Sequence, residues 1–204
     1  KKGILMEYIR GEHLCGETGR EKIRELAKTL RLLHSTKKNP YVHETINETT
    51  LKVYEKIRDD DCIKDEVKEA INLMETYTEQ VELESVQKVN IHGDLNARNI
   101  LSTHDKIILI DWEYAGWEIP FFDLSYLSLR LCYNQDEETQ LLNYYLEREP
   151  LERDLRIYYL TKKIHLTQIC VFFHYFSLKY RTQNSGIKDS HPKDIMNCMK
   201  IWNT

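Results

Sequence analysis

Glycine and proline are scarce in this sequence, with 7 and 4 copies among 204 residues. Both residues interrupt regular secondary structure, because glycine favours turns and proline stops helices. Many of the remaining positions carry long charged side chains, which are good helix formers. The shortage of these two residues therefore excludes a chain built of many short strands and turns, and it predicts a mainly helical one.

Several features of membrane, secreted and nucleic-acid-binding proteins are also missing. No apolar run approaches the roughly 18 residues of a membrane helix, and the first residues do not have the pattern of a signal peptide. The net charge is −4, without a basic stripe for nucleic acid. The five cysteines are far apart and form no CxxC pair, which favours reduced thiols. We expect a cytoplasmic protein without membrane or nucleic-acid partners.

Apolar residues recur at helical spacing over most of the chain. The first such segment opens with Thr18 and Glu21 at the spacing of a capping box. Helices are expected at residues 18–35, 64–81, 122–133, 136–149, 151–181 and 191–203. The polar stretch 39–61 is expected to form a loop and one short helix.

The middle of the chain has a different pattern. Short β-type runs occur at 88–91, 99–102 and 106–110 and are separated by polar residues. They predict one small β element over residues 88–111. Residues 3–9, GILMEYI, predict another short strand near the beginning of the sequence.

The polar residues of this β element are unusual for the ends of core strands. The pattern H-G-D-x-x-x-x-N contains His92, Asp94 and Asn99, and the next apolar run ends on Asp111. A carboxylate can take a proton from a hydroxyl, while an amide oxygen and a second carboxylate suit Mg²⁺. Each residue alone could be a turn former or a strand cap. Their combination favours phosphoryl transfer.

These motifs also carry a family resemblance. HGDLNARNIL (92–101) and ILIDWEYAG (108–116) resemble the choline kinase and aminoglycoside phosphotransferase superfamily, which has the protein-kinase-like fold. The second motif is most similar to bacterial choline kinases and thiamine kinases. ILMEYIRG (4–11) resembles the hinge between the two lobes of such kinases, and LAKTLRLLHS (26–35) resembles the helix that follows the hinge. By motif, the resemblance covers residues 3–130.

The resemblance implies a mainly α fold with a small β-hairpin element, the C-terminal lobe of a protein-kinase-like fold. Residues 1–16 would form the hinge segment, and residues 17–204 the helical lobe with its catalytic β element at 88–111. Since the sequence begins at the hinge motif, we expect the N-terminal lobe to be absent and this piece to be inactive alone. The surface so exposed is expected to self-associate through residues 3–9 or the mouth of the pocket.

The resemblance also implies a role for each matching residue. Asp94 matches the catalytic base, and Asn99 and Asp111 match the Mg²⁺ ligands. His92 and Asp123 are expected to be structural residues that brace the catalytic loop. The residues expected to bind ATP are Met6, Glu7, Ile9, Leu101 and Ile110.

The acceptor is expected to be a small alcohol. Trp112, Tyr114 and Trp117 follow the metal aspartate, and aromatic faces bind quaternary ammonium groups such as that of choline. Glu113 could add negative charge, although a solvated surface role is equally open. Thiamine, ethanolamine and aminoglycosides remain alternative acceptors. A kinase-like binding module without catalysis also remains open.

Overall fold

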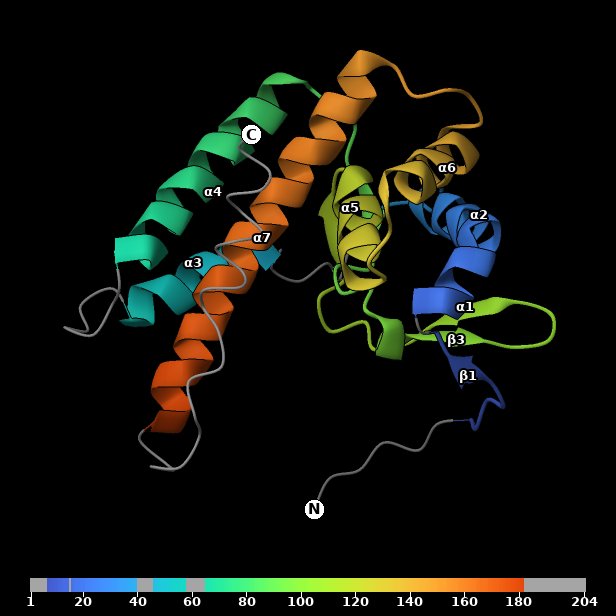
Figure 1. Ribbon diagram of the computed structural model, residues 1–204, viewed down its shortest axis with the longest axis horizontal. Helices are drawn as coiled ribbons and strands as arrows, with labels where there is room; N and C mark the ends of the chain where they lie inside the picture. The colour runs from blue at the N-terminus through green and yellow to red at the C-terminus, as the bar shows by residue number, and fades with distance from the viewer. Residues whose placement is uncertain (1–6, 15, 40–45, 58–64, 182–204) are drawn as a thin grey trace.

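The computed structural model describes residues 7–14, 16–39, 46–57 and 65–181 (Figure 1). In chain order the elements are β1 (Glu12–His13), α1 (Gly16–Glu21), α2 (Ile23–His34), α3 (Ile46–Ile57), α4 (Asp65–Leu83), β2 (Val89–Ile91), the short 3-10 helix η1 (Ala97–Asn99), β3 (Ile100–Ser102), β4 (Ile107–Leu109), β5 (Gly116–Glu118), α5 (Phe121–Arg130), α6 (Gln135–Leu146) and α7 (Glu152–Arg181). The predicted mainly helical fold with a small β element is confirmed.

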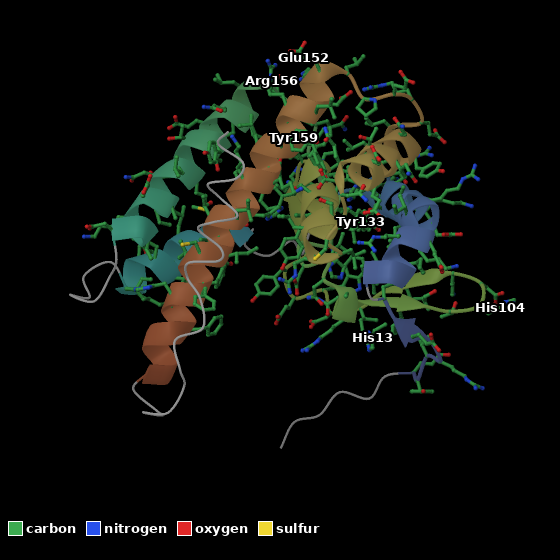
Figure 2. All side chains as sticks on the ribbon, viewed as in Figure 1. His13, His104, Tyr133, Glu152, Arg156 and Tyr159 are labelled. Carbon is green, nitrogen blue, oxygen red and sulfur yellow. The ribbon has the colours of Figure 1, made fainter. Side chains whose placement is uncertain are left out.

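The long helix α7 organises the helical part of the molecule. Figure 1 shows α7 crossing the centre, with α3 and α4 on one side and α5, α6 and α2 on the other. Figure 2 marks Glu152 and Arg156 where this helix begins. The helix packs against α3, α4 and α5, and α6 packs against α2. The predicted helices at 64–81 and 151–181 are thus confirmed as α4 and α7.

Burial of apolar faces explains why these helices pack as they do. The α4 positions Val67, Ala70, Ile71 and Met74 are all buried, as their helical spacing requires. Removing a large apolar side chain from water stabilises the fold by about 1.5–3 kcal/mol. On α7, Tyr158 is completely buried and its hydroxyl donates to Ser128 Oγ of α5 at 2.6 Å. The core therefore extends across α7 from α4 to α5.

The β element consists of two small antiparallel sheets and not of a single hairpin. One sheet has the order β1-β3-β4, and the other pairs β2 with β5. Asn90 lies opposite Trp117 in the second sheet, and Leu101 lies opposite Ile108 in the first. The predicted range 88–111 was therefore too short. Residues 92–99 form a loop and η1, which separate β2 from β3. As a result β2 pairs with β5 and not with β3.

The predicted strand at residues 3–9 is wrong in the part that the structure describes. Residues 7–10 are not in a strand, and Met6 lies outside the described residues. The strand begins only at Glu12, where the backbone reaches β3 and pairs with Ser102. A strand requires a partner edge for its backbone groups, and the described segment before Glu12 has none in the sheet.

The predicted helix at 18–35 is interrupted at Lys22. The carbonyl of Gly19 accepts hydrogen bonds from Lys22 N at 3.2 Å and from the Tyr133 hydroxyl at 2.8 Å. The Gly19 carbonyl therefore accepts from these two groups in place of the usual helical N–H donor. The regular helix is interrupted there, and the segment forms two helices, α1 and α2. Thr18 lies inside α1, so the proposed capping box is wrong. The predicted helix at 191–203 lies outside the described residues.

Two further points bear on the class of protein. Within the described ranges, no helix has the length and apolarity needed to cross a membrane. Cys132 is exposed and Cys170 is buried. The remaining three cysteines lie outside the described residues.

Candidate active site

The loop after β2 holds the Asp94 carboxylate in place. Its Oδ2 accepts hydrogen bonds from the side-chain amides of Asn96 at 2.9 Å and Asn99 at 2.8 Å. Asn99 Nδ2 also donates to the Asp94 carbonyl at 2.9 Å. Because the nitrogen of the Asn99 amide faces Asp94, its oxygen faces the opposite way. The amide oxygen is then available to a cation.

Asp111 lies beside this loop at the end of β4. The Ile110 N–H donates to the Asn99 carbonyl at 3.0 Å, which joins the two segments directly. Asp111 itself has φ of 65°, in the left-handed region that costs most side chains about 1–2 kcal/mol. This backbone turn ends the strand, and the Asp111 side chain is exposed. The predicted residues Asp94, Asn99 and Asp111 thus come from adjoining segments.

Tyr114 lies close enough to Asp94 and Asp111 to be affected by the charges of both carboxylates. Partial burial raises the pKa of its hydroxyl, and the negative charges of Glu113, Asp94 and Asp111 raise it further. The segment that carries Tyr114 also approaches the loop closely, because a Cβ on Gly93 would lie 2.1 Å from the Tyr114 carbonyl oxygen. The tyrosine and both aspartates therefore occupy one region of the surface.

Asp123 on α5 braces the loop from inside the protein. Its buried carboxylate accepts the backbone N–H groups of His92 at 2.8 Å and Gly93 at 2.9 Å. His34 Nε2 lies 3.0 Å from the same carboxylate, and Tyr145 OH lies 2.8 Å from His34 Nδ1. Burial raises the pKa of Asp123, but the hydrogen bonds and charge of His34 and the two N–H groups outweigh burial and lower it.

His92 ties the loop to the end of β4. Its Nε2 donates to the Ile110 carbonyl at 3.0 Å, while its Nδ1 accepts the Asp94 N–H at 3.3 Å. The ring lies against Trp112, with centroids 4.6 Å apart. Both nitrogens are thus engaged with the protein. This arrangement suits a positioning role and leaves the ring no free nitrogen for chemistry.

The chemistry of the donor set decides which cation the site could hold. Among the described residues, no three His, Cys, Asp or Glu side chains gather as metal ligands. The candidate set has one carboxylate, that of Asp111, and one amide oxygen, that of Asn99. Hard oxygen donors in small number are what Mg²⁺ uses when it keeps waters and substrate phosphates in its shell. The set therefore fits Mg²⁺ bound together with a nucleotide.

Comparison with known families identifies the family of the chain. A model described as the phosphotransferase enzyme family (APH) matches residues 3–158. The chain belongs to this family. Comparison with curated protein sequences finds no match.

Solved structures of phosphotransferases share the fold. A choline/ethanolamine kinase family protein from Mesorhizobium loti matches with a TM-score of 0.73 and 18% identity, over 89% of this chain and 62% of its own. The choline kinase LicA from Streptococcus pneumoniae matches with a TM-score of 0.72 and 21% identity, over 90% and 63%. Aminoglycoside 2'-phosphotransferase-IIIa, solved with GDP, matches with a TM-score of 0.58 and 16% identity, over 86% and 64%.

The extent of these matches sets their meaning. The chain spans a little over three fifths of the length of the structures it matches. LicA has also been solved in complex with AMP. At these identities the likeness establishes the fold of this phosphotransferase family member. It agrees with the predicted resemblance to choline kinases and aminoglycoside phosphotransferases.

Met6 lies outside the described residues, and the other residues predicted to bind nucleotide lie along the first sheet and in the segment before it. Leu101 is in β3 next to β1, and Ile110 follows β4. Both are partly buried, as is Ile9, whereas Glu7 is exposed. Leu101 and Ile110 flank Asn99 along the chain and across the sheet. They could form one apolar wall beside the candidate metal ligands.

The predicted acceptor-site residues separate into two groups. The first group directly follows Asp111 and consists of Trp112, Glu113 and Tyr114. The Trp112 side chain is 44% exposed, and its ring contacts the ring of His92. Trp117 instead lies in β5, and the Lys38 ammonium stands 5.1 Å from its ring centroid. A face of Trp117 thus already carries a cation of the protein. The structure brings Trp112 and Tyr114 to the loop and leaves Trp117 on the β2-β5 sheet.

Sequence reasoning missed two residues that contact this site. Tyr126 of α5 donates its hydroxyl to Asp94 Oδ1 at 2.9 Å. His34 of α2 reaches Asp123 as described above. Helical spacing places Tyr126 about one turn after Asp123, and this is the only local signal for it. No local pattern indicates His34, because its partner lies far along the chain.

Proposed function

We propose that the whole protein transfers the γ-phosphoryl group of ATP to the hydroxyl of a small molecule, with choline as the first candidate. The observation that supports it most directly is the hydrogen bond of Asn99 Nδ2 to Asp94 Oδ2. This bond joins a candidate base and a candidate metal ligand in one rigid unit. Phosphoryl transfer depends mainly on positioning and charge neutralisation, and such a unit supplies both.

Each residue of the unit has a separate task. Asp94 accepts the proton of the acceptor hydroxyl. Asn99 Oδ1 and the Asp111 carboxylate hold Mg²⁺, which neutralises charge on the phosphates when it is bound. Asp123 and His92 keep the loop in place through the hydrogen bonds given above.

ATP is the proposed phosphoryl donor. Leu101 and Ile110 offer an apolar wall for the adenine, and the backbone of Glu7 and Ile9 would meet its edge. Met6 completes this set in the sequence. The AMP complex of LicA and the GDP complex of the aminoglycoside phosphotransferase support a nucleotide as a substrate of this protein. We place the protein in the cytoplasm, without membrane or nucleic-acid partners.

Choline is favoured because the acceptor side combines aromatic rings with negative charge. Tyr114 and the exposed Trp112 lie next to Asp94 and Asp111, and Glu113 lies between them in sequence. A quaternary ammonium gains about 0.5–2 kcal/mol from such a ring. The Lys38 nitrogen near Trp117 makes that residue a weaker candidate. Ethanolamine, thiamine and aminoglycosides are the alternative acceptors.

A panel of acceptors tests the proposal. The whole protein is incubated with ATP, Mg²⁺ and either choline, ethanolamine, thiamine or an aminoglycoside, and the product is identified by mass spectrometry. We expect phosphocholine and its loss in the Asp94→Asn variant. Nucleotide binding without transfer to any acceptor would favour the kinase-like binding module. Transfer to the aminoglycoside alone would show that the acidic side chains select the acceptor.

A further inference from the structure

Tyr126 is held firmly beside the proposed base. Its hydroxyl donates to Asp94 Oδ1 at 2.9 Å. Its ring packs edge-on against His165 of α7, with centroids 5.0 Å apart, and the Arg130 guanidinium stands 5.9 Å from the ring centroid. Burial, and then the charge of Asp94, raise the pKa of this hydroxyl. Tyr126 therefore stays protonated at neutral pH and acts as a hydrogen-bond donor.

The hydrogen bonds of Asp94 identify one open position on its carboxylate. The two oxygens of a carboxylate accept about four hydrogen bonds. Asn96 and Asn99 both donate to Oδ2, and Tyr126 donates to Oδ1. Counting all donors in the described part of the chain, one acceptor position remains, and it lies on Oδ1. A hydroxyl that gives its proton to Asp94 must approach this oxygen, next to Tyr126.

We propose that Tyr126 is a positioning residue of the acceptor site, which holds Asp94 Oδ1 toward the acceptor hydroxyl and lies beside that hydroxyl. This role depends on the phosphoryl transfer proposed above, and it specifies which oxygen of Asp94 takes the proton. The acceptor O–H bond breaks and its proton moves to Oδ1. The acceptor oxygen bonds to the γ-phosphorus of ATP, while the bond to the bridging oxygen breaks and its electron pair leaves with ADP.

A double-mutant cycle separates this role from a general effect on folding. Tyr126→Phe removes only the hydroxyl and is made in the native protein and in the Asp94→Asn variant. The kcat with choline and ATP is measured for all four proteins. Each value is divided by the fraction that binds nucleotide, which calorimetry gives as a stoichiometry. This division removes any loss that is due to unfolded protein.

We expect Tyr126→Phe to lower kcat about tenfold in the native protein, a part of the 10²–10⁴-fold that a general base contributes. In the Asp94→Asn variant the same change should lower kcat less than about twofold, because residues that act through one another are not additive. The KM for ATP should stay within about twofold.

Tyr133→Phe is the matched control. Tyr133, labelled in Figure 2, is buried, whereas Tyr126 is partly buried. Each hydroxyl donates one hydrogen bond, but that of Tyr133 goes to the Gly19 carbonyl and not to Asp94. It should leave kcat within about twofold. If Tyr126→Phe lowers kcat equally in both backgrounds, or does not lower it in the native protein, the proposed role of Tyr126 is wrong while the proposed function stands. If the native protein phosphorylates no acceptor, the proposed function is wrong as well.

Discussion

Asp94 and Asp111 differ in their surroundings although both are carboxylates. Asp94 is partly buried and receives hydrogen bonds from Asn96, Asn99 and Tyr126. Asp111 is exposed and has a strained backbone. A carboxylate held by three hydrogen bonds suits a fixed base, whereas an exposed one can meet a hydrated cation. The two residues should therefore respond differently to the same substitution.

Asp94→Asn should lower kcat at least about 100-fold, because it removes the proton acceptor. The affinity for nucleotide should change little, since the base acts on the other substrate.

Asp111→Asn should weaken binding of the Mg²⁺–nucleotide complex as well, because a negative ligand is lost. Calorimetry with ATP and Mg²⁺, together with kcat, checks both. Asp105→Asn, at an exposed turn, is the control and should change neither; equal nucleotide affinity in all three variants would contradict the role of Asp111.

Tyr114→Ala should raise the KM for choline by a factor of roughly 2 to 30, from the loss of about 0.5–2 kcal/mol of cation–π energy. The KM for ATP should stay nearly constant, because the proposed role of the ring concerns the acceptor and not the nucleotide. Tyr114→Phe keeps the ring and should retain most of the affinity. Tyr144→Ala removes a tyrosine from α6 that contacts Arg24 and serves as a control. If every acceptor KM is unchanged, the ring does not bind the acceptor.

At the scale of elements, the loop 92–99 depends on close contacts from three directions. Asp123 holds its backbone from α5, His92 binds the end of β4, and Gly93 touches the segment of Tyr114. Gly93 has φ of 82°, a conformation that glycine adopts without strain. The loop geometry thus relies on one residue without a side chain.

Gly93→Ala should destabilise the protein by about 2–5 kcal/mol. The left-handed backbone accounts for about 1–2 kcal/mol and the clash with the Tyr114 carbonyl for about 1–3 kcal/mol. Gly116→Ala is the matched control, because a Cβ there would meet Ile91 at an ordinary 3.7 Å. Urea unfolding of the two variants makes the comparison. Similar stability in both would mean that the close approach at Gly93 does not constrain the loop.

At the scale of the whole molecule, α7 joins the site to the helical core. His165 of α7 is buried, and its ring lies against Phe122 and Tyr126 of α5. Burial lowers the pKa of His165 to about 4, although hydrogen bonds to Phe122 and Gln168 act in the opposite direction. The folded protein therefore prefers the neutral ring.

This preference predicts a loss of stability in mild acid. Between pH 6.5 and about 4 the unfolded chain binds a proton at His165 that the folded chain does not. Stability therefore falls as the pH falls through this window, by about 2 kcal/mol between pH 7 and pH 5. Urea unfolding at both pH values should show this difference, and His165→Gln should reduce it. His104→Gln, at the exposed hairpin tip in Figure 2, is the control and should leave this pH-dependent difference in stability unchanged. If the difference is also unchanged in His165→Gln, His165 is not its source.

Self-association also belongs to this scale and stays a proposal. The suggested surface is residues 3–9 or the mouth of the pocket. In the described part of that segment Tyr8 is largely exposed, which leaves an aromatic ring available. Light scattering over a series of concentrations measures the mass. The domain boundaries at residues 16 and 17 likewise stay a prediction.

The sequence by itself determined the long helices and the contact between Asp94 and Asn99. The helical pattern of α4 and α7 is local, because residues three and four apart share one face. The motif around Asp94, Asn99 and Asp111 is also local, since a short loop and a strand turn join these residues. Spacing along the chain was therefore enough to predict that Asp94 and Asn99 lie together.

Only the tertiary structure decided how these pieces meet. The pairing of β2 with β5, the break at Lys22 and the bond of Tyr126 to Asp94 each depend on partners far along the chain. In each case a hydrogen-bond acceptor meets its donor only after the chain has folded. The acceptors are a strand edge, the Gly19 carbonyl and Asp94 Oδ1. Hydrogen bonds of this kind are set by three-dimensional proximity, and no local pattern of residues encodes them.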